Sequence, residues 1–213
     1  KIIATIPSRR AYCRFAPDGS AILTADRSSV RRWPIEITED SNRGFQVTIG
    51  EPSVIYEGAI KRFCMDGSGR FLVLVPYTHE IISVDMENEN AVQQIGLHND
   101  LDRIAITPDG RFIFTSTWQG WAVRVWEHES SELMQTLVPF WRSTSLNVSP
   151  DGERLLLVSG PKLAAWSTQT WDKIWEHDRN NPANWPGPIA SSNHGRFIAC
   201  CASRYVPQLC DVK

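Results

Sequence analysis

Residues 106–110 read Ile-Thr-Pro-Asp-Gly, and close copies of this stretch stand at 15–19 (Phe-Ala-Pro-Asp-Gly) and at 148–152 (Val-Ser-Pro-Asp-Gly). Two looser copies end at Gly69 and Gly195, so that five glycines follow one another at intervals of 50, 41, 42 and 43 residues. Proline presets φ and glycine accepts a positive φ, which suits a tight turn between antiparallel strands. A regular period near forty residues predicts a repeated four-stranded unit, the length of a β-propeller blade.

The clearest unit, 91–128, predicts strands at 91–95, 103–107, 111–116 and 122–127. We expect one all-β domain over 1–213, with helix nearly absent because no apolar pattern of 3.6-residue period competes. The segment Glu36–Pro52, acidic at its start, is interpreted as an exposed loop inserted between the first two units. The five units cover approximately 2–37, 53–88, 91–128, 133–169 and 173–213.

Several predicted strands are apolar at consecutive positions, as in 71–75 and 155–158. A strand with packed neighbours on both faces has no solvent side, so radially stacked sheets explain these runs. Tryptophans of the closing strands, such as Trp126, are then expected to be packing anchors.

The charge, the apolar runs and the cysteines of the chain limit the classes of function that it can have. The 213 residues carry a formal charge of −2, which gives no global attraction to nucleic acid or to an anionic membrane. No apolar run is long enough to span a bilayer. The odd number of cysteines, five, without a Cys-x-x-Cys pair, predicts reduced, buried thiols and a cytoplasmic protein. Because the chain begins at Lys1 without a methionine, we interpret it as a piece of a longer protein.

The repeats resemble WD40 repeats over essentially the whole chain. The turn ending at Gly110, the strand 111–116 and the closing run 123–126 match that family's core unit. His98 stands near the histidine of the family's Gly-His pair, and Asp26 stands at the family's structural aspartate. The resemblance implies a propeller, usually of seven blades. We therefore expect the five units to be an arc of a larger ring, although a ring closed at five is the alternative.

The family's Gly-His pair is missing from four units, and its turn aspartate is missing from most. The His–Ser/Thr–Trp–Asp hydrogen-bond network of the family is therefore expected to be incomplete in every unit. Segments such as 30–35, 118–121 and 185–190 look like the WD40 regions of large bacterial proteins, many of which also carry a serine/threonine protein kinase domain. This chain itself has no Gly-rich phosphate loop, His-Arg-Asp or Asp-Phe-Gly motif.

The resemblance also implies that loops from several units meet on one face, where the family binds partners, and here they carry aromatic and arginine residues typical of interface hot spots. The partner-binding candidates are His98, Trp118, Trp121, Trp141, Arg142, Trp185, Arg204 and Tyr205. Trp141 and Trp185 could instead fill gaps between blades, and packing is as good an explanation as binding for Trp118 and Trp121. The loop 177–188 is either a recognition loop or a spacer.

No catalytic, cofactor-binding or metal-binding pattern is present: the five histidines lack metal spacing. Asp100 and Asp102 are interpreted as solvated loop acids. The channel-lining strands offer Arg14, Arg62, Arg103 and Asn147 but almost no acids. The sequence thus favours a non-catalytic scaffold for a protein or peptide partner, in a larger bacterial signalling protein. The alternatives are an enzyme-type propeller with its active site in the central channel, and a purely structural segment.

Overall fold

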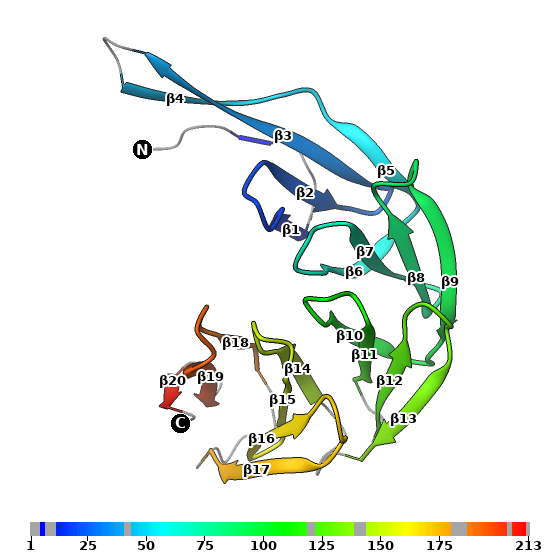
Figure 1. Ribbon diagram of the computed structural model, residues 1–213, viewed down its shortest axis with the longest axis vertical. Helices are drawn as coiled ribbons and strands as arrows, with labels where there is room; N and C mark the ends of the chain where they lie inside the picture. Colours follow the sequence, from blue (N-terminus) through cyan, green and yellow to red (C-terminus); the bar gives the residue numbers. More distant parts are fainter. Residues whose placement is uncertain are drawn as a thin grey trace.

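The computed structural model describes residues 5–6, 12–40, 44–118, 122–138, 144–179, 187–203 and 206–211. Within these ranges the chain forms twenty strands and no helix, arranged as five antiparallel sheets of a β-propeller. The sheets fan around a common centre, each with its first strand innermost (Figure 1). The all-β prediction and the five repeated sheets are confirmed.

Each sheet is a meander whose strands pair in chain order, except that β5 in the first sheet pairs with β3. The first sheet contains β1 (Tyr12–Phe15), β2 (Ala21–Ala25), β3 (Ser29–Asp40), β4 (Gly44–Ile49) and β5 (Ser53–Glu57). The second contains β6 (Ile60–Met65), β7 (Phe71–Pro76), β8 (Glu80–Asp85) and β9 (Ala91–Leu97). The third contains β10 (Leu101–Ile106), β11 (Phe112–Thr117), β12 (Val123–Glu127) and β13 (Leu133–Leu137). The fourth contains β14 (Thr144–Val148), β15 (Arg154–Ser159), β16 (Lys162–Ser167) and β17 (Lys173–Asp178). The fifth contains β18 (Ile189–Ser191), β19 (Phe197–Ser203) and β20 (Val206–Asp211).

The repeated glycines all lie in the same turn, between the first and second strands of each sheet. Their φ angles are +73°, +80°, +76°, +76° and +64° at Gly19, Gly69, Gly110, Gly152 and Gly195. In every copy the glycine N–H donates to the carbonyl three residues earlier, for example from Gly110 to Thr107 at 2.9 Å. A side chain at these positions would be strained, which is why the glycine recurs.

Apolar packing between neighbouring sheets holds the fan together. Four separate buried clusters fill the four spaces between successive sheets. Strand β15 illustrates the principle, since Leu155 and Leu157 belong to the cluster shared with the third sheet while Leu156 and Val158 face the fifth. Successive side chains of a strand point to opposite faces, so a strand between two sheets must be apolar throughout. This confirms the explanation of the continuous apolar runs.

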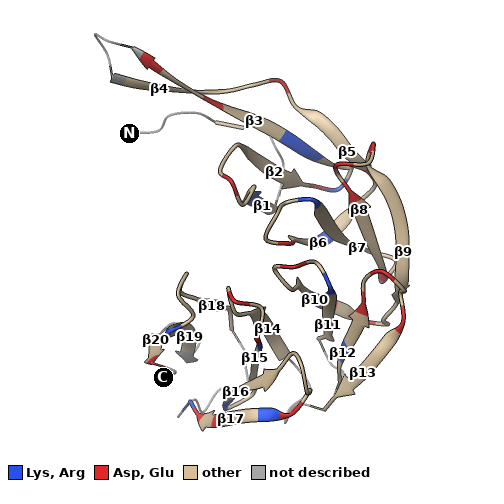
Figure 2. Cartoon of the chain, viewed as in Figure 1, with Lys and Arg blue, Asp and Glu red and all other residues tan. Residues whose placement is uncertain are grey.

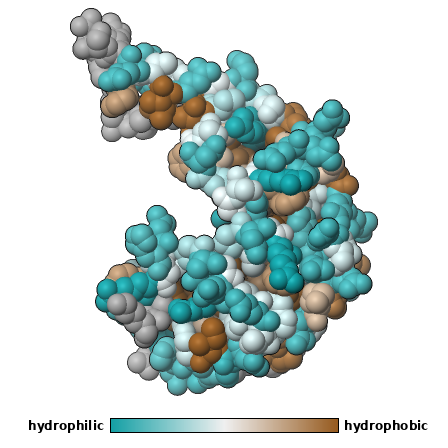
Figure 3. Space-filling model, in the orientation of Figure 1, coloured by the Kyte–Doolittle hydropathy of each residue, from teal (hydrophilic) through white to brown (hydrophobic). Residues whose placement is uncertain are grey.

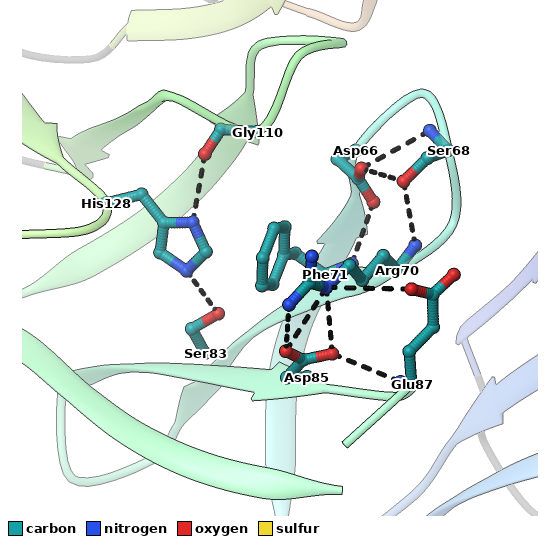
Figure 4. Close-up of polar contacts among 9 residues, drawn as sticks. All are labelled: Asp66, Ser68, Arg70, Phe71, Ser83, Asp85, Glu87, Gly110 and His128. Atoms are coloured by element: carbon teal, nitrogen blue, oxygen red, sulfur yellow. Dashed lines mark hydrogen bonds and ion pairs between the residues drawn. The ribbon is translucent and has the colours of Figure 1, made fainter.

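A polar contact also joins the second and third sheets (Figure 4). The Nδ1 of His128, just after β12, lies 2.9 Å from the carbonyl oxygen of Gly110, and its Nε2 lies 2.7 Å from the Ser83 hydroxyl on β8. The ring of Phe71 packs edge-on against His128, with centroids 4.4 Å apart. Burial lowers the pKa of His128, which is consistent with a neutral ring that donates to the carbonyl and accepts from the hydroxyl.

The segment predicted as an exposed loop, 36–52, is instead mostly strand. β3 continues to Asp40, and β4 pairs with its second half, so a two-stranded ribbon extends away from the ring (Figure 1). It is exposed as expected, with Ile37 and Phe45 open to solvent. Apolar and polar residues alternate in 35–38, as in one strand of a ribbon. The loop interpretation was wrong because it did not take this alternation into account.

The ring stands open between the first and the fifth sheet (Figures 1 and 3). All four residues of β1 are exposed, Phe15 at 69%, whereas β6, β10 and β14 are largely buried. Leu209 on β20 is 68% exposed at the other side of the opening. Each end sheet therefore lacks the neighbour that buries an internal sheet, while the expectation of further blades stays a prediction.

The expectation of buried cysteines holds only in part. Cys64 and Cys200 are buried, Cys201 and Cys210 are half-buried, and Cys13 is exposed. Cys13 departs from the prediction because it lies on β1, which has no sheet on its outer side. All five thiols are free.

Candidate binding face and central channel

The strand register places one set of turns at the same end of the propeller as the beginnings of the innermost strands. Pro76, the last residue of β7, pairs with Ile60 at the start of β6. Thr117, the last residue of β11, pairs with Leu101 at the start of β10. The turns that follow β7 and β11 therefore lie on this end of the propeller, which we call the upper face, and the repeated glycine turns lie on the opposite end.

Two aromatic side chains are exposed on the upper face. Tyr77 follows β7 and is 54% exposed, and Trp118 follows β11 and is 40% exposed. The backbone N–H of Trp118 donates to the backbone carbonyl of Asp100 at 3.3 Å, which connects this turn to the start of β10. We call Tyr77 and Trp118 the aromatic rim. Trp118 is thus exposed in the turn after β11, and its role in binding stays a prediction.

Six of the eight partner-binding candidates lie outside the described residues, namely Trp121, Trp141, Arg142, Trp185, Arg204 and Tyr205. The aromatic rim therefore contains only one of the predicted candidates, together with Tyr77. The signal that identifies Tyr77 in the sequence is its position directly after Pro76, where an apolar run ends in a turn.

His98 is buried, at 5% exposure, and is not part of an accessible surface. Its Nδ1 lies 2.8 Å from the hydroxyl of Thr115, and that hydroxyl also accepts the indole N–H of Trp126 at 3.0 Å. Burial lowers the pKa of His98 to about 4, so the imidazole is neutral near neutral pH. The prediction that His98 contacts a partner was wrong, because the fold turns it inward to satisfy Thr115.

The chain from His98 through Thr115 to Trp126 contains three of the four groups of the His–Ser/Thr–Trp–Asp network that the family resemblance implies. In the first sheet the tryptophan–threonine hydrogen bond of this chain is also present, since the Trp33 indole N–H donates to the Thr24 hydroxyl at 2.9 Å. Trp33 and Trp126 are both buried, which agrees with the prediction that closing-strand tryptophans are anchors.

The innermost strands of all five sheets surround a central cavity of about 350 Å³. Its lining includes Arg14 from β1, Arg62 from β6 and Arg103 from β10, so three of the four predicted channel residues meet there. Asn147, the fourth, lines an adjoining cavity of about 220 Å³ toward the glycine turns. The sequence correctly predicted which strands face the centre.

Asp102 is buried and holds the cationic residues together. Its Oδ2 lies 3.1 Å from Nη1 of Arg103, and its Oδ1 lies 3.5 Å from both Nζ of Lys61 and Nη2 of Arg62. The interpretation of Asp102 as a solvated acid was wrong. We call Arg14, Lys61, Arg62 and Arg103, together with Asp102, the basic mouth.

Bulges explain how these side chains come together. The register of β6 with β7 shifts between Ile60 and Arg62, and that of β10 with β11 shifts at the matching place between Leu101 and Arg103. A bulge inserts an extra residue and redirects a side chain, and bulges are frequent beside functional sites. Here the extra residues are Lys61 and Asp102, which form an ion pair between neighbouring sheets.

The described residues offer little for catalysis. Among them no group of three His, Cys, Asp or Glu side chains is placed to hold a metal ion. Cys64 lines the adjoining cavity, but burial raises the pKa of its thiol to about 12, so it is a poor nucleophile. In the described part of the chain there is no helix long and apolar enough to cross a membrane.

Comparison with protein-family profiles finds no match for this chain. Comparison with curated protein sequences also finds none. Among solved structures, the chain is similar to hydrazine synthase from Kuenenia stuttgartiensis, with a TM-score of 0.66 and 15% sequence identity. The match covers 94% of this chain and 58% of the other, so this chain corresponds to little more than half of that neighbour. At this identity the likeness supports the propeller fold alone.

Proposed function

We propose that this chain is a WD40-type propeller region that acts as a non-catalytic scaffold and binds a protein partner through its upper face. The observation that carries the proposal is the aromatic rim of Tyr77 and Trp118 at the upper ends of β7 and β11, on the same face as the basic mouth. Exposed aromatics beside arginines are the residue types that dominate protein interfaces.

The WD40-type assignment is supported by the hydrogen bonds linking His98, Thr115 and Trp126 and by the five equivalent glycine turns. A role as the docking region of a larger bacterial signalling protein, with an attached serine/threonine kinase, follows from the resemblance alone. Sequencing the gene on both sides of this segment tests that role, and reading frames without a kinase domain would remove it.

The experiment on the rim compares proteins recovered with the wild-type chain, with Tyr77→Ala and Trp118→Ala, and with the matched control Ile174→Ala. Ile174 is also half exposed but lies on the outermost strand β17. We expect the rim variants to lose a partner that the control retains, and titration of that purified partner to give a Kd at least about tenfold weaker for a hot-spot variant. Identical recovery with all variants would reject the proposal.

The enzyme alternative places an active site in the central channel. The neighbour's name, hydrazine synthase, describes that protein's activity and is not carried to this chain at 15% identity. In the described channel, the carboxylate of Asp102 is already in contact with three cations, so it is not free to contact a substrate. The scaffold is therefore the function we propose.

A further inference from the structure

The basic mouth has more positive charge than its own acid can neutralise. Three cationic side chains contact the Asp102 carboxylate and a fourth, Arg14, lines the same cavity as Arg62 and Arg103, in a chain whose formal net charge is −2. Elsewhere both signs are interspersed along the sheets (Figure 2). Neighbouring like charges repel one another, so a cluster of this kind is stabilised when an anion enters it.

Arg14 contributes most clearly to this excess. It is exposed, it lines the cavity from β1, and it forms no ion pair with any residue that the structure describes. Arg62, in contrast, donates to the Tyr12 hydroxyl, and its guanidinium lies 4.7 Å from the centre of the Tyr12 ring. These two contacts hold Arg62 in place at the cavity wall. Arg14, in contrast, remains available to bind an anion.

A second, independent observation comes from Ser145 on β14. The residue is buried and is one of those that line the same cavity, and its hydroxyl has no hydrogen-bond partner among the described residues. A buried hydroxyl without a hydrogen-bond partner destabilises the fold. An acceptor atom in the cavity would remove that cost.

The size and the contacts of the site indicate which anion fits. A cavity of about 350 Å³ accommodates a side chain and excludes a folded domain. The cluster already seats one carboxylate, that of Asp102, between Lys61, Arg62 and Arg103. Arginine guanidinium groups match carboxylates through paired hydrogen bonds.

We propose that the basic mouth binds a Glu or Asp side chain of an acidic peptide segment in the partner, with Arg14 as the main contact and Ser145 as a donor. The inference rests on the proposed function, since the acidic segment would belong to the protein that docks on the upper face. The aromatic rim would then contact the apolar residues that flank this segment.

The test measures fluorescence anisotropy of a labelled hexaglutamate peptide with the intact chain at low and at physiological salt. We expect binding that weakens with salt, and a Kd about tenfold weaker for Arg14→Ala. Arg111→Ala is the matched control because Arg111 is a well-exposed arginine at the glycine-turn end. Thermal melts of each variant verify that the fold is retained.

Asp102→Asn is expected to change the affinity for hexaglutamate in the opposite direction. This change removes the competing carboxylate but keeps the shape of the side chain, so hexaglutamate should bind several-fold more tightly. Loss of folding would act in the opposite direction and is detected in the same melts. An unchanged or weaker Kd in a folded Asp102→Asn protein would contradict the proposal.

Two further probes distinguish binding of an acidic peptide from binding of other anions. Inorganic phosphate that displaces the peptide at equal concentration would indicate a small-anion site, and a decathymidylate that binds as well as hexaglutamate would indicate general polyanion binding. Either result overturns the proposal. An equal loss of hexaglutamate affinity in Arg14→Ala and in Arg111→Ala would also overturn it. The rim experiment is independent of this test. If Trp118→Ala loses a partner but the wild-type chain does not bind hexaglutamate, the scaffold function is retained and only this inference is rejected.

Discussion

The guanidinium of Arg70 contacts both carboxylate oxygens of Asp85, with Nε 3.1 Å from Oδ1 and Nη2 2.7 Å from Oδ2. Arg196 and Asp211 repeat this arrangement in the fifth sheet, with Nη2 2.9 Å from Oδ2. In both sheets the arginine directly follows the repeated glycine, and its guanidinium also lies over the next phenylalanine ring, at 4.7 and 4.9 Å. Gly-Arg-Phe together with an aspartate at the end of the third strand thus forms a structural clasp between the second and third strands of a sheet.

We expect Asp85→Asn to lower the melting temperature at neutral pH. The hydrogen bonds from Arg70 lower the pKa of Asp85, so the ionised carboxylate is favoured in the folded state. This contribution is present above the ordinary pKa of 3.8 and is lost as the pH falls through the lower folded value. The difference between wild type and variant should therefore shrink in acid.

Glu127→Gln is the matched control for the clasp. The carboxylate of Glu127 reaches Arg111 only at 3.9 Å through one pair of atoms. Paired contacts are stronger than a single distant one, so the control should melt closer to the wild type. Equal effects of the two substitutions would show that the paired geometry contributes nothing.

Replacing Trp126 by alanine should lower the free energy of unfolding by about 3–5 kcal/mol, because the change leaves a cavity in the cluster between the second and third sheets. Denaturant titration measures the loss. Trp118→Ala, which removes an indole that is 40% exposed, should cost less than Trp126→Ala. A melting midpoint for Trp126→Ala within a degree of the wild type would refute the role of anchor.

The stability of the fold should fall as the pH decreases from about 6.5 toward 4. The unfolded chain protonates His98 at its ordinary pKa of 6.5, whereas burial lowers that pKa to about 4 in the folded state. In this interval only the unfolded state gains the proton, which removes up to about 3 kcal/mol of stability. His128 acts in the same direction because burial also lowers its pKa.

His98→Gln tests this pH dependence, since glutamine can still bond to Thr115 but does not titrate. We expect the variant to lose much of the slope of unfolding free energy against pH between 6.5 and 4, measured by urea titration. The same slope in the variant and the wild type would assign the effect to other groups.

The thiols should react in the order of their exposure. Cys13 is exposed, whereas burial raises the pKa of Cys64 to about 12 and that of Cys200 to about 11. Iodoacetamide followed by peptide mapping should therefore label Cys13 first in the native protein, and the two buried thiols only after denaturation. Early labelling of Cys64 would indicate that the second sheet opens in solution.

The repeat, the turns and the choice of inward strands could be predicted because each depends on local rules. A positive φ requires glycine in the turn, and a strand between two sheets must be apolar on both faces. The β3–β4 ribbon was missed although the alternation at Ile35 and Ile37 was visible, because the acidic residues beside it were taken as evidence for a loop.

The roles of individual polar residues depended on the tertiary structure. His98 looked like an accessible loop residue, and Asp102 looked like a solvated acid, yet both are buried. Their partners, Thr115 for His98 and Lys61 for Asp102, lie 17 and 41 positions away in the sequence. Local sequence rules do not determine which distant group a side chain meets.

The sequence by itself determined a fan of repeated antiparallel sheets, because strand periodicity and turn chemistry act over a few residues and recur five times. The tertiary structure alone decided that Asp102 is buried between Lys61, Arg62 and Arg103, and which side chains remain at the surface. The physical reason is that charge clustering and burial depend on how separate sheets pack around the common centre.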